Sequence, residues 1–404
     1  MAGSDLAPRD LPVFPFEDMT GLDVFGLYAE LRELDPVRPV RVASGGQVYL
    51  VSRYEDARRV FTDPVFSRVA LQRPEVTVLI PASRIPGTPL NMDAPDHTRM
   101  RKLIARAFTT GAVERMRPRV QKFTDDLIDS MIEQGPPVDF VASFAEVLPA
   151  LVISDMLGVP DTDQLQLRHW LEISLSAGAH TPQEIQQALE ALSGYLVRLI
   201  ADKRTAPAND LLSALIAARD EGERLSEPEL ISTLFILIAG GYETTAGLLA
   251  NSLVMLNYHH PDQLALLRGK PELIPDAVEE LLRCVPMAWC ACERVALEEV
   301  ELSGVTIPAG STVVPLIYSA NRDEAVIGEP DRLDVTRTAY TPHLGFGHGI
   351  HRCLGAPLGR LELQTAFATL LRRLPELRPA VPESELTWKL GFIPVGPRAL
   401  PVTW

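Results

Sequence analysis

The residues best placed for chemistry surround one cysteine near the C-terminal end of the 404-residue chain. In Phe346-Gly-His-Gly-Ile-His-Arg-Cys-Leu-Gly355, three glycines flank Cys353, and a predicted helix with Pro357 in its first turn follows directly. The positive helix end and its unpaired N–H groups favour a thiolate over a thiol, and glycines let the backbone approach the sulfur. This pattern favours metal ligation. Two alternatives stay open, a small buried apolar side chain or a nucleophile, although the neighbours of Cys353 supply no acid to orient a base.

A second candidate group lies inside an apolar helix expected to start at Glu227 and to reach Tyr258. Ser226-Glu-Pro-Glu229 is a capping box with an early proline, and about 30 residues at about 1.5 Å each make a rod of about 45 Å. Halfway along stands Gly240-Gly-Tyr-Glu-Thr-Thr245. Adjacent glycines cost about 1 kcal/mol each relative to alanine. They indicate either a packing kink or a widened helix that aims the acid Glu243 and the alcohol Thr244 at a small ligand.

Two charged pairs complete the candidate residues. His97 and Arg101 are spaced to share one helix face, where they could grip an anion. Glu280 and Arg283 are spaced to form an ion pair on the predicted helix that ends near Cys284. Taken alone, both patterns are typical of exposed helix surfaces.

The elements that must position these residues form a mainly α-helical fold with a smaller β-containing lobe. Helical patterns fill residues 96–285 and 354–374, whereas short strands and turns fill residues 37–60, 286–320 and 380–404. A proline-rich stretch, residues 71–95, is either a binding loop or a disordered segment. Because no flexible linker separates the helical regions from the strand-containing regions, we expect a single domain spanning residues 1–404.

The cysteine segment resembles the haem-binding loop of the cytochrome P450 family. That loop reads Phe, two residues, Gly, one residue, His or Arg, one residue, Cys, one residue, Gly, as Phe346, Gly349, His351, Cys353 and Gly355 do here. The resemblance implies the P450 fold, with a long central helix over a haem b. It also implies that Cys353 is the axial thiolate ligand of the iron, that Phe346 packs near the sulfur, and that His351 reaches a haem propionate.

The other motifs fall in the family's order. The segment 240–245 resembles the oxygen-binding helix, with Glu243 and Thr244 as the proton-delivery pair, although Gly240 stands where many members carry alanine. His97 and Arg101, after the turn 93–96, match a propionate-binding pair, and Arg294 matches a further propionate-binding arginine. Glu280 and Arg283 match the family's ExxR motif, which has a folding role. The later segment Pro330-Asp-Arg-Leu333 leads us to expect that Arg332 completes a structural triad with that pair.

Composition sets limits on partners and location. The chain carries 38 Lys and Arg against 53 Asp and Glu, a net charge of −15, which argues against nucleic acid or anionic membrane as a partner. The N-terminus has no signal-peptide pattern, and the apolar stretch 230–241 is too short to span a bilayer. Four cysteines do not make a disulfide scaffold, and a zinc site at Cys290 and Cys292 lacks further ligands. We therefore expect a cytoplasmic monomer with reduced thiols.

The resemblance implies a monooxygenase that uses O2 to oxidise a small molecule. We expect a mid-sized hydrophobic or aromatic substrate from natural-product biosynthesis. Four segments are expected to line its pocket: Val78, Leu79, Ile80 and Leu90; Leu237 and Gly241; residues 287–290, which include Trp289; and Phe392 and Ile393. Oxidative C–C or aryl coupling of a cyclic peptide is an alternative reaction. A non-catalytic haem gas sensor, or a thiol-dependent hydrolase without haem, is an alternative class.

Electrons must come from a separate donor, because nothing in the sequence resembles a flavin or iron–sulfur domain. Residues 97–122 hold eight basic residues and one acidic residue, Glu114, which gives 8 − 1 = +7 on an acidic chain. With Arg352 and Arg360, this segment predicts a docking patch for an acidic ferredoxin served by a ferredoxin reductase. A merely solvated pair of helices is the alternative.

Overall fold

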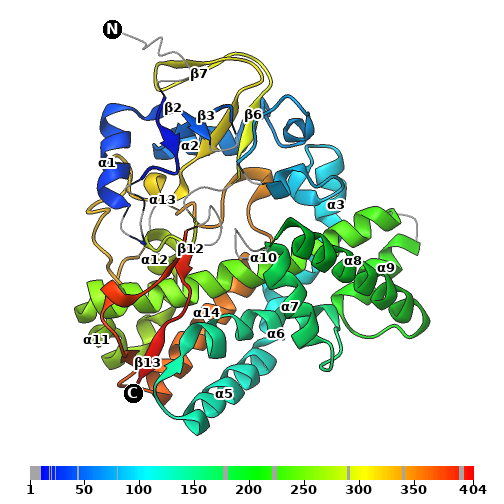
Figure 1. Cartoon of the computed structure of the whole chain (residues 1–404), viewed down its shortest axis with the longest axis vertical. Coiled ribbons are helices and arrows are strands. Elements are labelled where there is room, and N and C mark those ends of the chain that lie inside the picture. The colour runs from blue at the N-terminus through cyan, green and yellow to red at the C-terminus, as the bar shows by residue number, and fades with distance from the viewer. Residues whose placement is uncertain are drawn as a thin grey trace.

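The structure is a computed structural model. It describes residues 11–17, 19, 21–22, 24–42, 45–79, 81–175, 181–220, 225–288, 292–338, 342–390 and 395–404. Most of the helices lie in the lower part of the molecule as drawn, with the long helix α10 running across the middle, and strands β2, β3 and β6 lie at the top with α1 and α2 beside them (Figure 1). The helices are α1 Phe25–Leu34, α2 Tyr54–Thr62, α3 Asp96–Ala105, α4 Thr110–Glu114, α5 Arg117–Gln134, α6 Val147–Leu157, α7 Gln164–Leu175, α8 Pro182–Thr205, α9 Leu211–Asp220, α10 Glu227–Val254, α11 Pro261–Gly269, α12 Ile274–Cys284, α13 Ile317–Ala320 and α14 Ala356–Arg373.

The largest sheet has six strands in the order β1-β2-β3-β9-β6-β4. These are β1 Val13–Phe14, β2 Val37–Val42, β3 Gln47–Val51, β9 Thr312–Pro315, β6 Arg294–Ala296 and β4 Phe66–Ser67. Strands β2 and β3 pair in antiparallel within the range 37–60 where the sequence predicts short strands, whereas β9 joins β3 in parallel from more than 250 residues away in sequence. The sheet thus brings Arg294, on β6, into register with Val313 on β9.

The C-terminal strands do not join this sheet. Strand β13, Pro401–Thr403, pairs with β10, Arg378–Pro379, and with β5, Val138–Asp139, beside the helices. Two hairpins complete the strands, β7 Val300–Leu302 with β8 Val305–Ile307 and β11 Trp388–Leu390 with β12 Val395–Pro397. Strands β12 and β13 therefore contact elements of the helical part, α10 and β5, rather than extending the six-stranded sheet.

Helix α10 begins as the sequence predicts. Ser226 and Glu229 form the reciprocal capping box, in which the Glu229 carboxylate accepts from the Ser226 N–H at 2.6 Å. The same carboxylate pairs with Arg99 of α3, so that one side chain caps the central helix and ties α3 to it. Burial would raise the pKa of Glu229, but hydrogen bonds from Ser226 and Arg99 hold it below its ordinary value. The start of α10 is therefore fixed relative to α3.

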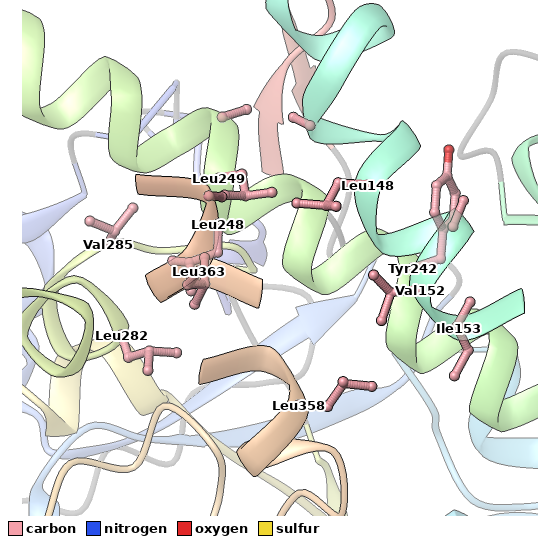
Figure 2. Packing of buried hydrophobic residues seen from close by; sticks show 14 of the residues in the cluster. Leu148, Val152, Ile153, Tyr242, Leu248, Leu249, Leu282, Val285, Leu358 and Leu363 are labelled. Atoms are coloured by element: carbon pink, nitrogen blue, oxygen red, sulfur yellow. The ribbon is translucent and has the colours of Figure 1, made fainter. Parts of the chain in front are cut away.

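Apolar packing holds α10 in the middle of the core. Leu148, Val152 and Ile153 of α6 face Tyr242 and the Leu248–Leu249 pair of α10, with Leu358 and Leu363 of α14 alongside (Figure 2). A Cβ on Gly241 would lie 3.3 Å from the Ile153 side chain, so this glycine allows close approach of the two helices. Gly241 therefore serves the packing of α6 against α10, and its place in the substrate pocket stays a prediction.

Helix α10 continues through a π-helical segment, Met255–His259. Among the described residues, this 33-residue helix, Glu227–His259, is long and apolar enough to cross a membrane by length and composition alone. The helix has the extent predicted from the sequence, Glu227 to Tyr258, and the apolar stretch 230–241 is only one part of it. Half of the most apolar 18-residue stretch of this helix is buried against the rest of the fold, as happens in a core helix.

One buried carboxyl group gives the fold a pH dependence. Glu362 on α14 is 2% exposed, its Oε2 atom has no hydrogen-bond partner among the described residues, and burial raises its pKa from 4.5 to about 8. Between these two values the native state keeps a proton that the unfolded chain releases, so stability falls as pH rises, by at most about 1.4 kcal/mol per pH unit. This stability is fully present below pH 4.5 and is lost as pH rises through about 8.

The Glu362→Gln variant is expected to remove this slope, because the amide has no proton to lose in the same range. Urea midpoints at pH 5.5, 6.5 and 7.5 would measure it, with Glu133→Gln, an exposed glutamate on α5, as the control. A slope as steep in Glu362→Gln as in the parent protein would contradict the assignment.

Candidate functional site

The loop before Cys353 is shaped by glycines that no other residue could replace without strain. A Cβ on Gly345 would lie 2.4 Å from the carbonyl oxygen of Leu282, and one on Gly349, at φ +70°, would lie 2.5 Å from that of Phe61. The Cys353 N–H donates to the Phe346 carbonyl oxygen at 2.8 Å. The loop is therefore wedged between α2 and α12, and its position is set by backbone contacts.

The sulfur of Cys353 lies at the start of α14, as predicted. The Gly355 N–H donates to it, and Arg101 and Arg352 add positive charge nearby. The Cys353 side chain is exposed, so the sulfur is open to a ligand beside the loop. The Gly355 N–H and the two arginines favour the charged form of the sulfur, in the direction that the sequence predicts. A bound metal would ionise the thiol outright, because a coordinating thiol loses its proton.

Phe346 is held in place from the outside of the loop. The Arg360 guanidinium lies 4.7 Å from the centre of its ring and binds Glu279 through contacts of 2.6 and 2.7 Å. His343 also contacts Glu279, at 3.2 Å. Burial would raise the pKa of Glu279, but Arg360 and His343 lower it to about 2. Arg360, which we placed in the docking patch, is therefore partly neutralised.

Four predicted anion-binding residues come together beside the loop. His97 and Arg101 lie on α3, Arg294 lies on β6, and the ring of His351 stands 4.1 Å from that of His97. Arg101 donates to the Arg352 carbonyl oxygen, which joins α3 to the cysteine loop. The structure thus assembles residues that are more than 250 positions apart in the sequence.

The charge and burial of His97, Arg101, Arg294 and His351 favour the binding of a negatively charged group. Burial lowers the pKa of His97 to about 4, helped by Arg101 and Arg294, and lowers that of His351 to about 2, helped by Arg294 and His97. Burial and the charge of Arg68 lower the pKa of Arg294 to about 9. His97 Nδ1, His351 Nε2 and Arg294 Nη2 are buried without a hydrogen-bond partner among the described residues. Buried donors without partners are costly, so a carboxylate-bearing ligand fits this place.

Glu243 and Thr244 lie on α10, half-buried, and α10 packs against α14. The Thr244 hydroxyl donates to the Gly240 carbonyl oxygen at 2.8 Å. A Cβ on Gly240 would meet no atom within 4 Å, so this side of the helix is open where the Gly241 side is packed. The two glycines thus have different roles, which the dipeptide alone does not reveal.

The structure corrects the third member of the ion-pair triad. Arg283 binds Glu280 through two contacts of 2.8 Å, and Arg337, not Arg332, adds the second guanidinium at 3.1 Å. The Arg332 side chain is 58% exposed and lies by Glu329, while its carbonyl oxygen accepts from both other arginines. Burial would raise the pKa of Glu280, but Arg283 and its other donors hold it below the ordinary value.

A second buried network was not predicted. Arg68, 2% exposed, donates to the carbonyl oxygens of Leu90 and Glu293 and to the Asn91 side chain, at 2.7 to 2.9 Å. The Glu293 carboxylate accepts from the Leu79 N–H at 2.8 Å. The proline-rich segment is therefore anchored at Leu79 and again at Leu90 and Asn91, as a binding loop would be. An arginine whose partners are mainly backbone atoms leaves no signal in the sequence.

Part of the expected substrate pocket cannot be placed. Ile80, Trp289, Cys290, Phe392 and Ile393 lie outside the described residues. Of the remaining residues, Leu79 is buried and Leu237 is partly buried against the core.

Comparisons with known proteins agree with this geometry. The family model described as Cytochrome P450 matches residues 268–379. Nocardicin C N-oxygenase of Nocardia uniformis subsp. tsuyamanensis is 46% identical, covering 98% of this chain and 99% of that protein. Mycinamicin IV hydroxylase/epoxidase of Micromonospora griseorubida is 44% identical, covering 97% and 98%.

A solved structure extends the likeness to the fold. The crystal structure of the LnmA cytochrome P450 hydroxylase, from the leinamycin biosynthetic pathway of Streptomyces atroolivaceus, superposes with a TM-score of 0.90. It is 42% identical and covers 98% of this chain and 100% of its own. The predicted α-rich fold with a smaller β lobe is thereby confirmed. The chain belongs to the cytochrome P450 family and is a haem-thiolate monooxygenase.

Proposed function

We propose that Cys353 is the axial ligand of the haem iron and that the cationic cluster of His97, Arg101, Arg294 and His351 binds the haem propionates. The observation that carries this proposal is the set of buried, unpartnered nitrogen atoms beside the cysteine loop. Two carboxylates would satisfy these donors and neutralise the positive charge that lowers the pKa of both histidines. Phe346, fixed by Arg360, packs near the sulfur.

When bound through a thiolate, haem supplies the electronic push that favours O–O bond cleavage in dioxygen. The protein's own contribution is to deliver protons on the α10 side. The Thr244 hydroxyl donates to the Gly240 carbonyl oxygen, so the oxygen atom of Thr244 remains able to accept a hydrogen bond from a ligand or water. Glu243, one residue before it, is the proton donor in this assignment. The open space beside Gly240 leaves room for that ligand.

We propose hydroxylation of a mid-sized hydrophobic small molecule from bacterial natural-product biosynthesis. Two relatives, named for nocardicin C and mycinamicin IV, support this class of substrate. Purified protein would be screened with such molecules for a spin-state change of the haem, and products of the molecules that bind would be identified by mass spectrometry. A mass gain of one oxygen supports hydroxylation, whereas a loss of two hydrogens indicates coupling. Absence of NADPH consumption with every ferredoxin pair would favour a gas sensor instead.

We propose that electrons come from an acidic ferredoxin, itself reduced by a ferredoxin reductase, in the cytoplasm, and that the enzyme acts as a monomer. The structure narrows the predicted docking patch, because acidic side chains pair with four of its eight basic residues: Arg99, Arg117, Arg119 and Lys122. Arg106, Arg115 and Arg352 are exposed. We define these three as the docking patch.

Reversing charge in this patch, with Arg106→Glu and Arg115→Glu together, is expected to raise the KM for an acidic ferredoxin about tenfold. Activity driven by hydrogen peroxide should not change, because it needs no docking. The control is Arg378→Glu on β10, which pairs with β13 at the end of the molecule away from α3 (Figure 1). An equal KM in the double variant and the control would contradict this docking site.

A further inference from the structure

One buried side chain on α10 joins two segments that are distant in the sequence. The Asn251 side-chain NH2 donates to the carbonyl oxygens of Pro286 and Val395, both at 2.7 Å, across 35 and 144 residues of chain. Asn251 is fully buried. Both of its N–H donors are therefore used to bind backbone carbonyl oxygens of these two segments.

The two segments are also bonded to each other. The Val395 N–H donates to the Met287 carbonyl oxygen at 2.8 Å, which joins residues 286–288 to β12. Strand β12 lies beside α10 (Figure 1). We call β12 together with residues 286–288 the wall. A Cβ on Gly396 would come within 2.9 Å of the Asn251 Oδ1 atom. The absence of a side chain at Gly396 therefore lets β12 approach the amide.

The location of this wall relates it to the proposed site. Asn251 follows Thr244 by seven residues, which is about two turns and about 10 Å along the same face of an α-helix. Arg294 of the cationic cluster follows Ala288 by six positions in the sequence. The wall thus contacts the α10 face that carries Thr244.

We propose that Asn251 is a positioning residue that sets the placement of this wall and thereby the shape of the substrate site. The inference rests on the proposed function, because it requires substrate to bind beside this face of α10. Removing the amide leaves two buried carbonyl oxygens without donors, and the wall would shift to find other partners. Gly396→Ala would displace β12 by contact alone, without removing a hydrogen-bond donor.

The test compares two nitrogen ligands of ferric haem iron that differ in size. Imidazole needs little more than the iron, whereas clotrimazole, with three aryl rings, must also fit the surrounding walls. Soret-band titrations would give both dissociation constants for the parent protein, Asn251→Leu, Gly396→Ala and the control Ser252→Ala. Ser252 is the neighbouring residue, equally buried, and its hydroxyl has no hydrogen-bond partner among the described residues.

We expect clotrimazole binding to weaken about tenfold in Asn251→Leu and Gly396→Ala, with imidazole binding changed less than about twofold. Ser252→Ala should match the parent protein. A purely structural role would change haem content and leave the ratio of the two constants as it was. An unchanged ratio in Gly396→Ala would overturn the inference whether or not Asn251→Leu folds. A parent protein without a Soret band would instead contradict the proposed function.

Discussion

The Arg337→Ala variant is expected to be less stable than the parent protein by about 3 kcal/mol. Its guanidinium contacts the Glu280 carboxylate at 3.1 Å and donates to the carbonyl oxygens of Gly328, Glu329 and Arg332. Glu280 is 3% exposed, so the loss of one cation leaves buried negative charge poorly compensated. Removing Arg337 also leaves three backbone carbonyl oxygens without this donor.

Arg332→Ala is the matched control, because this arginine lies in the same segment with an exposed side chain. Its loss should cost about 0.5 kcal/mol or less. Denaturant midpoints followed by far-ultraviolet circular dichroism would compare the two variants with the parent. If Arg332→Ala shifted the midpoint as much as Arg337→Ala, the corrected triad would be wrong.

The Thr244→Ala variant is expected to consume electrons without making a matching amount of product. Haem and substrate should still bind, because the hydroxyl that alanine removes makes a hydrogen bond within α10, to the Gly240 carbonyl oxygen. Without that hydroxyl, the delivery of protons to dioxygen would no longer be controlled, and the reduced oxygen would leave as hydrogen peroxide. We expect product formed per NADPH consumed to fall at least about tenfold.

Thr244→Ser distinguishes the loss of the hydroxyl group from the loss of side-chain volume, since it keeps the hydroxyl and removes only the methyl group. It should restore most of the coupling between electron use and product. The measurement is peroxide and product yield per NADPH, alongside the substrate-induced spin shift. Tight coupling in Thr244→Ala would exclude this threonine from proton delivery.

Several features of the site could be predicted from the sequence because they depend on local chemistry. The capping box at Ser226 and Glu229 and the helix that begins after Cys353 need only neighbouring residues to form. The grouping of His97, Arg101, Arg294 and His351 came from the family resemblance, and the structure brings these residues together.

Other features depend on which distant backbone atoms meet, and they could not be predicted. Arg337 replaces Arg332 in the triad because of how the segment turns, not because of the residue types. Arg68 and Asn251 bond mainly to carbonyl oxygens, which every residue possesses.

The most direct test of the account is the absorption spectrum of the reduced protein with carbon monoxide, recorded for the parent and for Cys353→Ser. The parent should show the long-wavelength Soret band that is characteristic of thiolate-ligated haem, and Cys353→Ser should lose this band. A parent protein without haem, or a Cys353→Ser variant that keeps the thiolate band, would contradict the assignment of Cys353 as the iron ligand.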